Sequence, residues 1–296
     1  MGAPRIAVAV VTMGNRPDEV DALLESVAKQ DVPPERIVIV GNGCPLPDFA
    51  RLSLPGEVTA VELDENLGCP GGRNAALARL REFGDIDVVV DLDDDGLLVD
   101  PDVLRRVRDL YAADERLGIV GFRIADELGE TQQRHVPRIG NSDPLRGGYV
   151  TGFLGGGHAL RMTMLDEVGD WPAEFFFAHE ETDLAWRAVD AGWRILYAPE
   201  LLLRHPKTSP ARHAIYFRVN ARNRVWLARR RLPLALVPVH LGVWVLLTLA
   251  RNRSGAGLRA WVGGFVEGVR EPAGERRPMR WRTVWRLTRL GRPPVV

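Results

Sequence analysis

The 296 residues are 46% hydrophobic and 26% charged, which is ordinary for a folded globular protein and excludes a disordered chain. Two cysteines, Cys44 and Cys69, exclude a disulfide framework and indicate a reducing, cytoplasmic compartment. The net charge is zero, but residues 204–296 hold 20 of the 39 Lys and Arg against three acids, a charge of +17 that leaves −17 for residues 1–203. This split predicts two parts with different roles, the basic one facing an anionic surface.

Apolar runs alternate with helical patterns over the first hundred residues. Buried strands are predicted at 6–11, 37–40, 58–63 and 88–92, and helices at 17–29 and 74–83. This order predicts an α/β fold, with a mostly parallel sheet and helices on its faces. Right-handed crossovers then place four loops along one edge of the sheet: 12–16, 41–44, 66–73 and 91–96.

The strand at Val88–Leu92 runs into a cluster of four carboxylates, Asp91, Asp93, Asp94 and Asp95. Such a cluster repels itself unless positive charge is close, and a hard divalent cation such as Mg2+ or Mn2+ supplies it. Ligands of open α/β sheets bind at the carboxyl ends of strands, where these residues lie. The sequence therefore predicts a metal that holds a diphosphate; a solvated acidic loop is the alternative.

Two glycine-rich segments follow strands. In residues 64–74, three glycines permit close backbone approach and a helix N-terminus offers N–H groups to phosphate, although a plain turn fits equally well. Arg73 at its end either forks onto a diphosphate or braces a carboxylate. Residues 147–158 either pack closely on a ligand or form a mobile loop, and the apolar and aromatic residues that follow favour a ligand.

A second acidic group, Glu180, Glu181 and Asp183, follows three phenylalanines and opens a predicted helix at 182–191. These acids either cap the helix or supply a general base, whose pKa the neighbouring aromatic residues would raise. His205 follows a late strand and is either structural or a ligand of metal or phosphate.

In this order the motifs resemble the family 2 glycosyltransferases, which have the GT-A fold, and in particular rhamnosyltransferase-like members. The resemblance covers residues 5 to 231. It rests on these elements: Thr12 with Arg16; Asn66, Gly68 and Arg73-Asn74; Asp93-Asp94-Asp95; Gly152; 168–170 before 175–176; 180–184 with Arg187; Gly192, Pro199 and His205; and Arg222-Asn223.

The resemblance implies an inverting, metal-assisted transfer of a sugar from a nucleotide diphosphate sugar of UDP, dTDP or GDP type. The implied metal ligands for Mg2+ or Mn2+ are Asp95, Asp93 and His205. The implied nucleotide-sugar pocket comprises Thr12, Arg16, Asn42, Asn66, Gly68, Arg73, Asp93 and Asp94. Glu181 matches the catalytic base, with Glu180 and Asp183 as alternatives.

Two positions depart from the family pattern. The second strand ends in Gly41-Asn42-Gly43, where the family usually has an aspartate that contacts the nucleotide base, so the base is left open. Glu181 stands where the family usually has aspartate, and either carboxylate accepts a hydroxyl proton.

Residues 232–250 form a run of nineteen residues without a charged side chain, flanked by arginines on both sides. The run fits an interfacial or re-entrant helix, a buried core helix or a membrane span. Residues 258–269 and 280–290 mix Trp, Leu and Val with Arg, as helices at membrane surfaces do. We expect a catalytic domain at 1–210 and a basic helical extension at 211–296 that binds the inner face of the cell membrane peripherally or forms a dimer.

The acceptor is expected to be a cell-envelope glycan, a polyprenyl-linked glycan or a small molecule such as a soluble secondary metabolite. No nucleic-acid-binding motif accompanies the arginines, so nucleic acid is not an expected partner. Two other classes stay open: a sugar nucleotidyltransferase, and an inactive membrane-anchored protein that binds nucleotide sugars. The poor fit of Met13–Pro17 to a nucleotidyltransferase signature speaks against the first, and the retained acids speak against the second.

Overall fold

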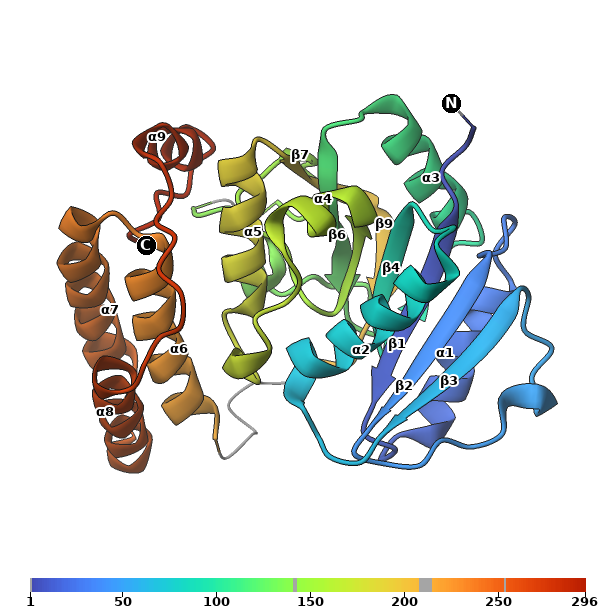
Figure 1. The fold of residues 1–296 in the computed structure, drawn as a ribbon, viewed down its shortest axis with the longest axis horizontal. Helices are drawn as coiled ribbons and strands as arrows, with labels where there is room; N and C mark the ends of the chain where they lie inside the picture. The colour runs from blue at the N-terminus through green and yellow to red at the C-terminus, as the bar shows by residue number, and fades with distance from the viewer. Residues whose placement is uncertain (1, 141–142, 208–214, 253) are drawn as a thin grey trace.

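A β-sheet runs through the amino-terminal two thirds of the molecule, and helices cover both of its faces (Figure 1). The computed structural model describes residues 2–140, 143–207, 215–252 and 254–296. The strands are β1 (Ile6–Thr12), β2 (Arg36–Asn42), β3 (Glu57–Leu63), β4 (Val88–Asp93), β5 (Leu97–Leu98), β6 (Leu117–Ala125), β7 (Gly148–Tyr149), β8 (Gly157–Arg161) and β9 (Arg194–Arg204). Their order is β3-β2-β1-β4-β8-β6-β9-β5, with β7 beside β9.

The first four strands pair in parallel, as the sequence predicts. Strands β1, β2 and β4 are almost fully buried, which explains their continuous apolar runs. Beyond β4 the sheet is mixed, because β8 runs antiparallel to both β4 and β6. The register places Asp93 of β4 opposite Val11 of β1. The loops after β1 and β4 therefore meet at one edge of the sheet.

Helices α1 (Pro17–Ala28) and α3 (Val103–Ala113) pack their buried residues on one face of the sheet. Helices α2 (Gly68–Phe83), α4 (Met162–Val168) and α5 (Glu180–Ala191) pack on the other face (Figure 1). Short 3-10 turns interrupt the connections at η1 (Phe49–Arg51), η2 (Gln133–His135), η3 (Ala173–Phe175) and η5 (Leu234–Leu236). The α/β prediction is confirmed.

Helix α2 begins six residues before the predicted start at 74. Its first turn, Gly68 to Gly72, is poor in helix-forming residues, and propensity alone misses it. A tertiary contact fixes this turn, since Cys69 N–H donates to Phe176 O at 3.0 Å. Gly68 has φ +72°, and a Cβ there would lie 2.1 Å from Phe176 O, so only glycine fits.

The carboxy-terminal helices α6 (Tyr216–Arg231), α7 (Val237–Arg251), α8 (Gly255–Arg270) and α9 (Trp281–Arg289) gather beyond α5 (Figure 1). Helix α8 lies directly on α6, because Gly264 and Gly268 leave room for the α6 backbone. Residues 273–279 then return along α6, where Met279 N–H donates to Arg231 O at 2.8 Å. The extension is thus packed against the sheet domain, and the predicted boundary near residue 210 lies outside the described residues.

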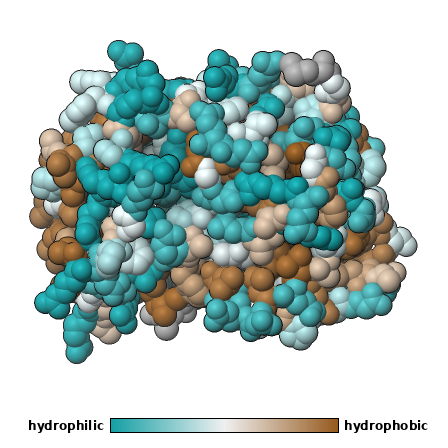
Figure 2. Space-filling model, in the orientation of Figure 1, coloured by the Kyte–Doolittle hydropathy of each residue, from teal (hydrophilic) through white to brown (hydrophobic). Residues whose placement is uncertain are grey.

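Helix α7 is poorly covered, and His240 is its one buried residue among those described. Among the described residues, Leu234–Arg251 is the one helical stretch long and apolar enough to cross a membrane, with a mean hydropathy of 1.8, and only 6% of it is buried. The buried-core interpretation of residues 232–250 is therefore wrong. Figure 2 shows hydrophobic side chains gathered at the edge of the molecule where Figure 1 places α7. Leu246 and Leu249 are 69% and 55% exposed there.

Candidate active site

The carboxylates that end β4 meet a histidine from the end of β9. Asp93, Asp95 and His205 each present a ligand atom within 4.8 Å of the others. His205 Nε2 lies 3.0 Å from Asp95 Oδ1 and 3.7 Å from Asp93 Oδ2. Two carboxylate oxygens suit Mg2+ or Mn2+, and the imidazole adds a nitrogen donor that a transition metal accepts. The three predicted metal ligands come together and fit a divalent cation.

Charge coupling between these groups is strong. Burial opposes the ionised form of Asp93, but the hydrogen bond to His205 and the charge of Arg73 outweigh it and lower the pKa of Asp93 to about 2. Burial likewise opposes the protonated form of His205, but Asp93 and Asp95 outweigh it and raise the pKa of His205 to about 10. A proton on His205 supplies the positive charge that a cation would otherwise bring to this site.

Thr12 and Arg16, from the end of β1, hold the other carboxylates. Thr12 Oγ1 donates to Asp94 Oδ2 at 2.8 Å. Arg16 Nη1 lies 2.9 Å from Asp94 Oδ1 and 2.6 Å from Asp95 Oδ2. Asp94 is thus occupied by protein partners, while Asp95 is shared between Arg16 and His205.

Arg73 lies beneath the site, and its side chain is 5% exposed. It reaches Asp91 and Asp93 at 3.2 Å each, and it donates to Gly155 O at 2.8 Å. Of the two predicted roles, this geometry supports bracing of carboxylates. The guanidinium also faces the ring of Trp171, 5.0 Å from its centroid.

Three residues around Arg73 were given no individual role from the sequence, although Asp91 was counted in the acidic cluster. Burial raises the pKa of Asp91 to about 6, although Arg73 partly opposes this. His158 is fully buried 4.0 Å from Asp91, and burial with the charge of Arg73 lowers its pKa to about 3. The third residue is Trp171, whose ring faces the Arg73 guanidinium. The position of Asp91 inside the aspartate cluster was the one sequence signal for its role. The roles of His158 and Trp171 had no such signal, because their contacts join residues distant in sequence.

Asn42 and Asn66 shape the loop that leads into α2. Asn42 Nδ2 donates to Asn66 Oδ1 and Gly68 O, and its Oδ1 accepts from Leu67 N–H at 2.8 Å. Asn66 Oδ1 also accepts from Gly68 N–H at 2.8 Å. The Asn42 side chain is 4% exposed with its polar atoms engaged, so it acts here through the shape of the loop.

The glycine segment before β8 lies between the β4 carboxylates and α5. A Cβ on Gly155 would lie 2.6 Å from Glu181 Oε1, and one on Gly156 would lie 3.3 Å from Asp93 Oδ2. Glycine at both positions therefore lets Glu181 and Asp93 approach one short stretch of backbone closely. Burial raises the pKa of Glu181, and burial with the charge of Glu181 raises the pKa of Glu180. Paired carboxyls with raised pKa values suit a general base.

The loop in front of α5 is strained. Phe176, Ala178 and His179 have φ values of 62°, 71° and 72°, a region that residues with a Cβ rarely adopt. Asn223 of α6 is fully buried, and its Nδ2 lies within 2.9 Å of three carbonyls of this loop, those of Phe175, Phe177 and Ala178. Asn223 thus fixes the loop that carries Glu180 and Glu181.

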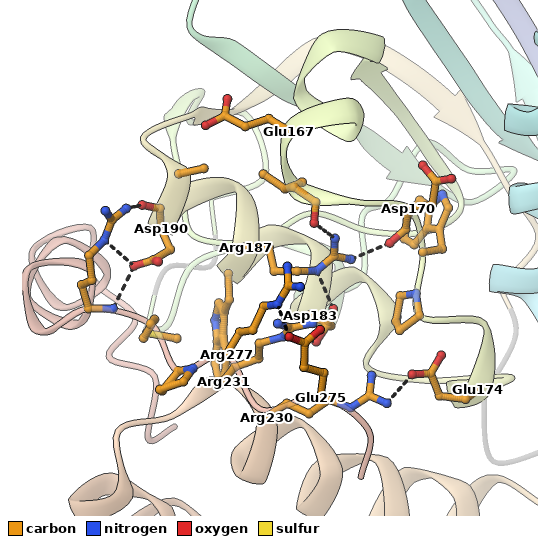
Figure 3. Close-up of a pocket in the computed structure, with 18 residues that line it drawn as sticks. Glu167, Asp170, Glu174, Asp183, Arg187, Asp190, Arg230, Arg231, Glu275 and Arg277 are labelled. Carbon is orange, nitrogen blue, oxygen red and sulfur yellow. Dashed lines mark hydrogen bonds and ion pairs between the residues drawn. The ribbon is translucent and has the colours of Figure 1, made fainter. Parts of the chain in front are cut away.

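Asp183 does not join this group. It is fully buried beside a cavity of about 650 Å³ between α5, α6 and residues 275–280 (Figure 3). Arg187 Nε reaches it at 2.8 Å and Arg231 Nε at 2.6 Å. Burial opposes ionisation, but the two arginines outweigh it and lower the pKa of Asp183. An ionised, doubly paired carboxylate holds α5 to α6 and is a poor proton acceptor.

Solved structures share this fold. S. aureus TarS 1–349 in complex with UDP-GlcNAc aligns with 95% of this chain and 83% of that one, at 18% identity and a TM-score of 0.61. Mannosyltransferase PcManGT from Pyrobaculum calidifontis, with GDP-Man and Mn2+, aligns with 98% and 85%, at 19% identity and a TM-score of 0.58. GalNAc-T7 with UDP, GalNAc and Mn2+ aligns with 90% and 54%, at 12% identity and a TM-score of 0.61. The chain spans half the length of a longer TarS chain, 50%.

No curated protein matches the sequence closely enough to count as a relative. A family model described as Glycosyltransferase like family 2 matches residues 4–225, which is most of the chain and includes the site residues described above except Arg231 and residues 275–280. The predicted family is confirmed: the chain belongs to the family 2 glycosyltransferases.

Proposed function

We propose that this chain transfers a sugar from a nucleotide diphosphate sugar to an acceptor hydroxyl with inversion at the anomeric carbon. One observation carries the proposal. Asp93, Asp95 and His205 meet at the carboxyl ends of parallel strands, and Glu181, which with Glu180 forms a pair of carboxyls with raised pKa values, lies against the glycine segment beside them. Cation ligands and a nearby base are what an in-line displacement needs.

Asp93, Asp95 and His205 would hold Mg2+ or Mn2+, which when bound neutralises the charge of the departing diphosphate. Arg16 pairs with Asp95 and Arg73 pairs with Asp93, and these contacts hold the two carboxylates in place before any cation arrives. Glu181 takes the proton of the acceptor hydroxyl as its oxygen attacks the anomeric carbon. Asn223 keeps Glu181 in place by fixing the loop in front of α5.

The structural relatives bound to UDP, UDP-GlcNAc and GDP-Man support a nucleotide sugar as donor here. A thermal-shift screen of UDP, dTDP and GDP sugars with Mn2+ tests this, because a ligand that binds the folded state raises its apparent stability. The true donor is expected to raise Tm only with the metal present. Equal shifts for all donors without metal would contradict the proposal.

The sugar nucleotidyltransferase alternative differs in its product. A glycosyltransferase releases a nucleoside diphosphate, whereas a nucleotidyltransferase forms or consumes pyrophosphate. We expect nucleoside diphosphate release that depends on acceptor, with slower release to water, and no pyrophosphate exchange. An inactive binding protein would release neither product.

For the acceptor, we propose a lipid-linked or cell-envelope glycan, reached from the cytoplasmic face of the membrane. The exposed apolar side chains of α7, including Leu246 and Leu249, support peripheral membrane binding. So do the exposed Trp281 and Trp285 of α9, since tryptophan suits the membrane interface. A soluble acceptor is the alternative.

Vesicle flotation tests the membrane proposal. The protein is expected to float with anionic vesicles, and a Leu246→Gln, Leu249→Gln double variant to stay in the soluble fraction. Val58→Gln is the control, because Val58 is an exposed apolar residue of β3, far from the extension in the chain. Wild-type protein that stays soluble but elutes as a dimer, while the double variant is monomeric, would assign the α7 face to self-association.

A further inference from the structure

Arg224 of α6 is a buried cation without a counterion. It is 9% exposed, and no hydrogen bond or ion pair of the described residues involves it; its nitrogens are not fully enclosed and reach solvent. Its guanidinium carbon lies 3.4 Å from the ring centroid of Trp244 on α7. Burial lowers the pKa of Arg224 to about 9. The guanidinium is therefore held by an aromatic ring and by nothing negative.

The groups around Arg224 are also cationic or unpaired. Burial together with the charges of Arg224, His240 and the exposed Arg292 lowers the pKa of His179, and burial together with Arg224 lowers the pKa of His240. His240 is 2% exposed, its Nδ1 donates to Pro294 O at 2.9 Å, and its Nε2 has no partner. His179 Nε2 and Trp244 Nε1 have no partner either. His240 thus bonds Pro294 and His179 bonds Asn220, while one nitrogen each of His179, His240 and Trp244 has no oxygen acceptor opposite it among the described residues.

Around the cavity of Figure 3, by contrast, arginines are paired with carboxylates. Arg187 and Arg231 share Asp183, and Arg230 pairs with Glu174 (Figure 3). Arg280 lies against Asp190. An unpaired buried cation costs several kcal/mol, whereas pairing and hydrogen bonding offset much of that cost. Arg224 has no such carboxylate partner among the described residues, and a bound anion would supply the missing negative charge.

We propose that Arg224, Arg292, His179 and Trp244 bind a phosphate group carried by the acceptor. Guanidinium forks match phosphate oxygens in pairs, and phosphate has enough oxygens for the remaining nitrogens. The location links the cluster to the reaction, because His179 directly precedes Glu180 and Glu181. Trp244 belongs to the exposed apolar helix α7, so a phosphate on a lipid reaches both features. This inference rests on the proposed glycosyl transfer for its role, but not for its binding step.

The binding step is tested with inorganic phosphate alone, against sodium chloride of equal ionic strength, by thermal unfolding and tryptophan fluorescence. We expect phosphate to raise the Tm of the wild-type protein and of Arg259→Met. Arg259 is an exposed arginine of the same extension, and its replacement removes the same charge. Arg224→Met is expected to be more stable than wild type without phosphate and to gain nothing from it. If that variant does not fold, Arg292→Met takes its place.

The source of the phosphate is separated by three probes: inorganic phosphate, a soluble phosphate monoester, and a polyprenyl phosphate in detergent micelles with detergent alone as control. A lipid acceptor predicts the largest shift with the third probe. In transfer assays, Arg224→Met should raise KM for a phosphate-bearing acceptor by about 10–100-fold, the usual value of a charge-assisted contact, and leave KM for the donor unchanged.

Two results would overturn the inference: no response of the wild type to any of the three probes, or equal responses of wild type and Arg224→Met. Hydrolysis of the nucleotide sugar by the wild type checks the proposed function separately. Donor hydrolysis without a phosphate response sinks the phosphate site alone. A phosphate response that depends on Arg224, without donor hydrolysis, supports the site and contradicts the proposed function.

Discussion

Replacing Gly155 with alanine tests the position of Glu181. A Cβ on Gly155 would lie 2.6 Å from Glu181 Oε1, about 0.8 Å inside the 3.4 Å at which ordinary contact begins. The other close atoms are the Arg73 guanidinium nitrogens at 3.3 and 3.4 Å, so the Glu181 carboxylate is what must move. A misplacement of about 1 Å in a catalytic group costs roughly 10²-fold in rate. We expect kcat for sugar transfer to fall by about 10–100-fold.

Gly152→Ala is the matched control, since a Cβ there has no atom within 4 Å. Both variants are assayed for kcat and for thermal unfolding. Little loss of Tm is expected in either, because the new methyl group of Gly155→Ala meets the ends of side chains and no backbone. A folded Gly155→Ala variant with wild-type kcat would show that the Glu181 carboxylate does not take part in the reaction.

Four further variants, two of them with a pH dependence, have expected outcomes. Glu181→Gln should cut transfer by roughly 10²–10⁴-fold with donor binding retained. In the wild type the pKa of Glu181 is raised, so the transfer rate should climb with pH as this carboxyl ionises. A rate that does not change with pH would count against Glu181 as the base. Asp95→Asn should abolish metal-dependent turnover and weaken nucleotide binding by calorimetry. Asp183→Asn removes the negative charge that pairs with Arg187 and Arg231. The free energy of unfolding, measured with denaturant, should fall by about 3–5 kcal/mol. The lowered pKa of Asp183 means that this stability is present above its unfolded pKa and lost as pH falls, a loss the variant should not show. Asn223→Asp removes the donor to three loop carbonyls, so both kcat and the stability of the protein should fall. Asn252→Asp is the control: it keeps the hydrogen bond from Ser254 N–H and should change neither quantity.

The parallel half of the sheet and the position of the Asp93–Asp95 carboxylates could be predicted because each depends on a short stretch of sequence. A run of valines followed by aspartates fixes both β4 and the end at which its carboxylates lie. The choice among Glu180, Glu181 and Asp183 could not be made this way. All three open one helix, and what separates Asp183 is Arg231, 48 residues later in a helix whose packing no local pattern reveals. The role of Asn223 was hidden for the same reason, since its three acceptors lie about 45 residues earlier.

Part of the +17 charge of the extension is neutralised by ion pairs within the protein. Arg218 and Arg222 both bind Glu267, and Arg231 binds Asp183. Such paired groups cancel locally and add little to the attraction of an anionic surface. Each exposed arginine near a membrane adds about 1 kcal/mol, which salt screens, whereas burial of the α7 apolar face is independent of salt. Membrane binding should therefore depend on α7 more than the formal +17 suggests, and the unpaired Arg224, buried beneath α7, is the charge that a single phosphate can reach.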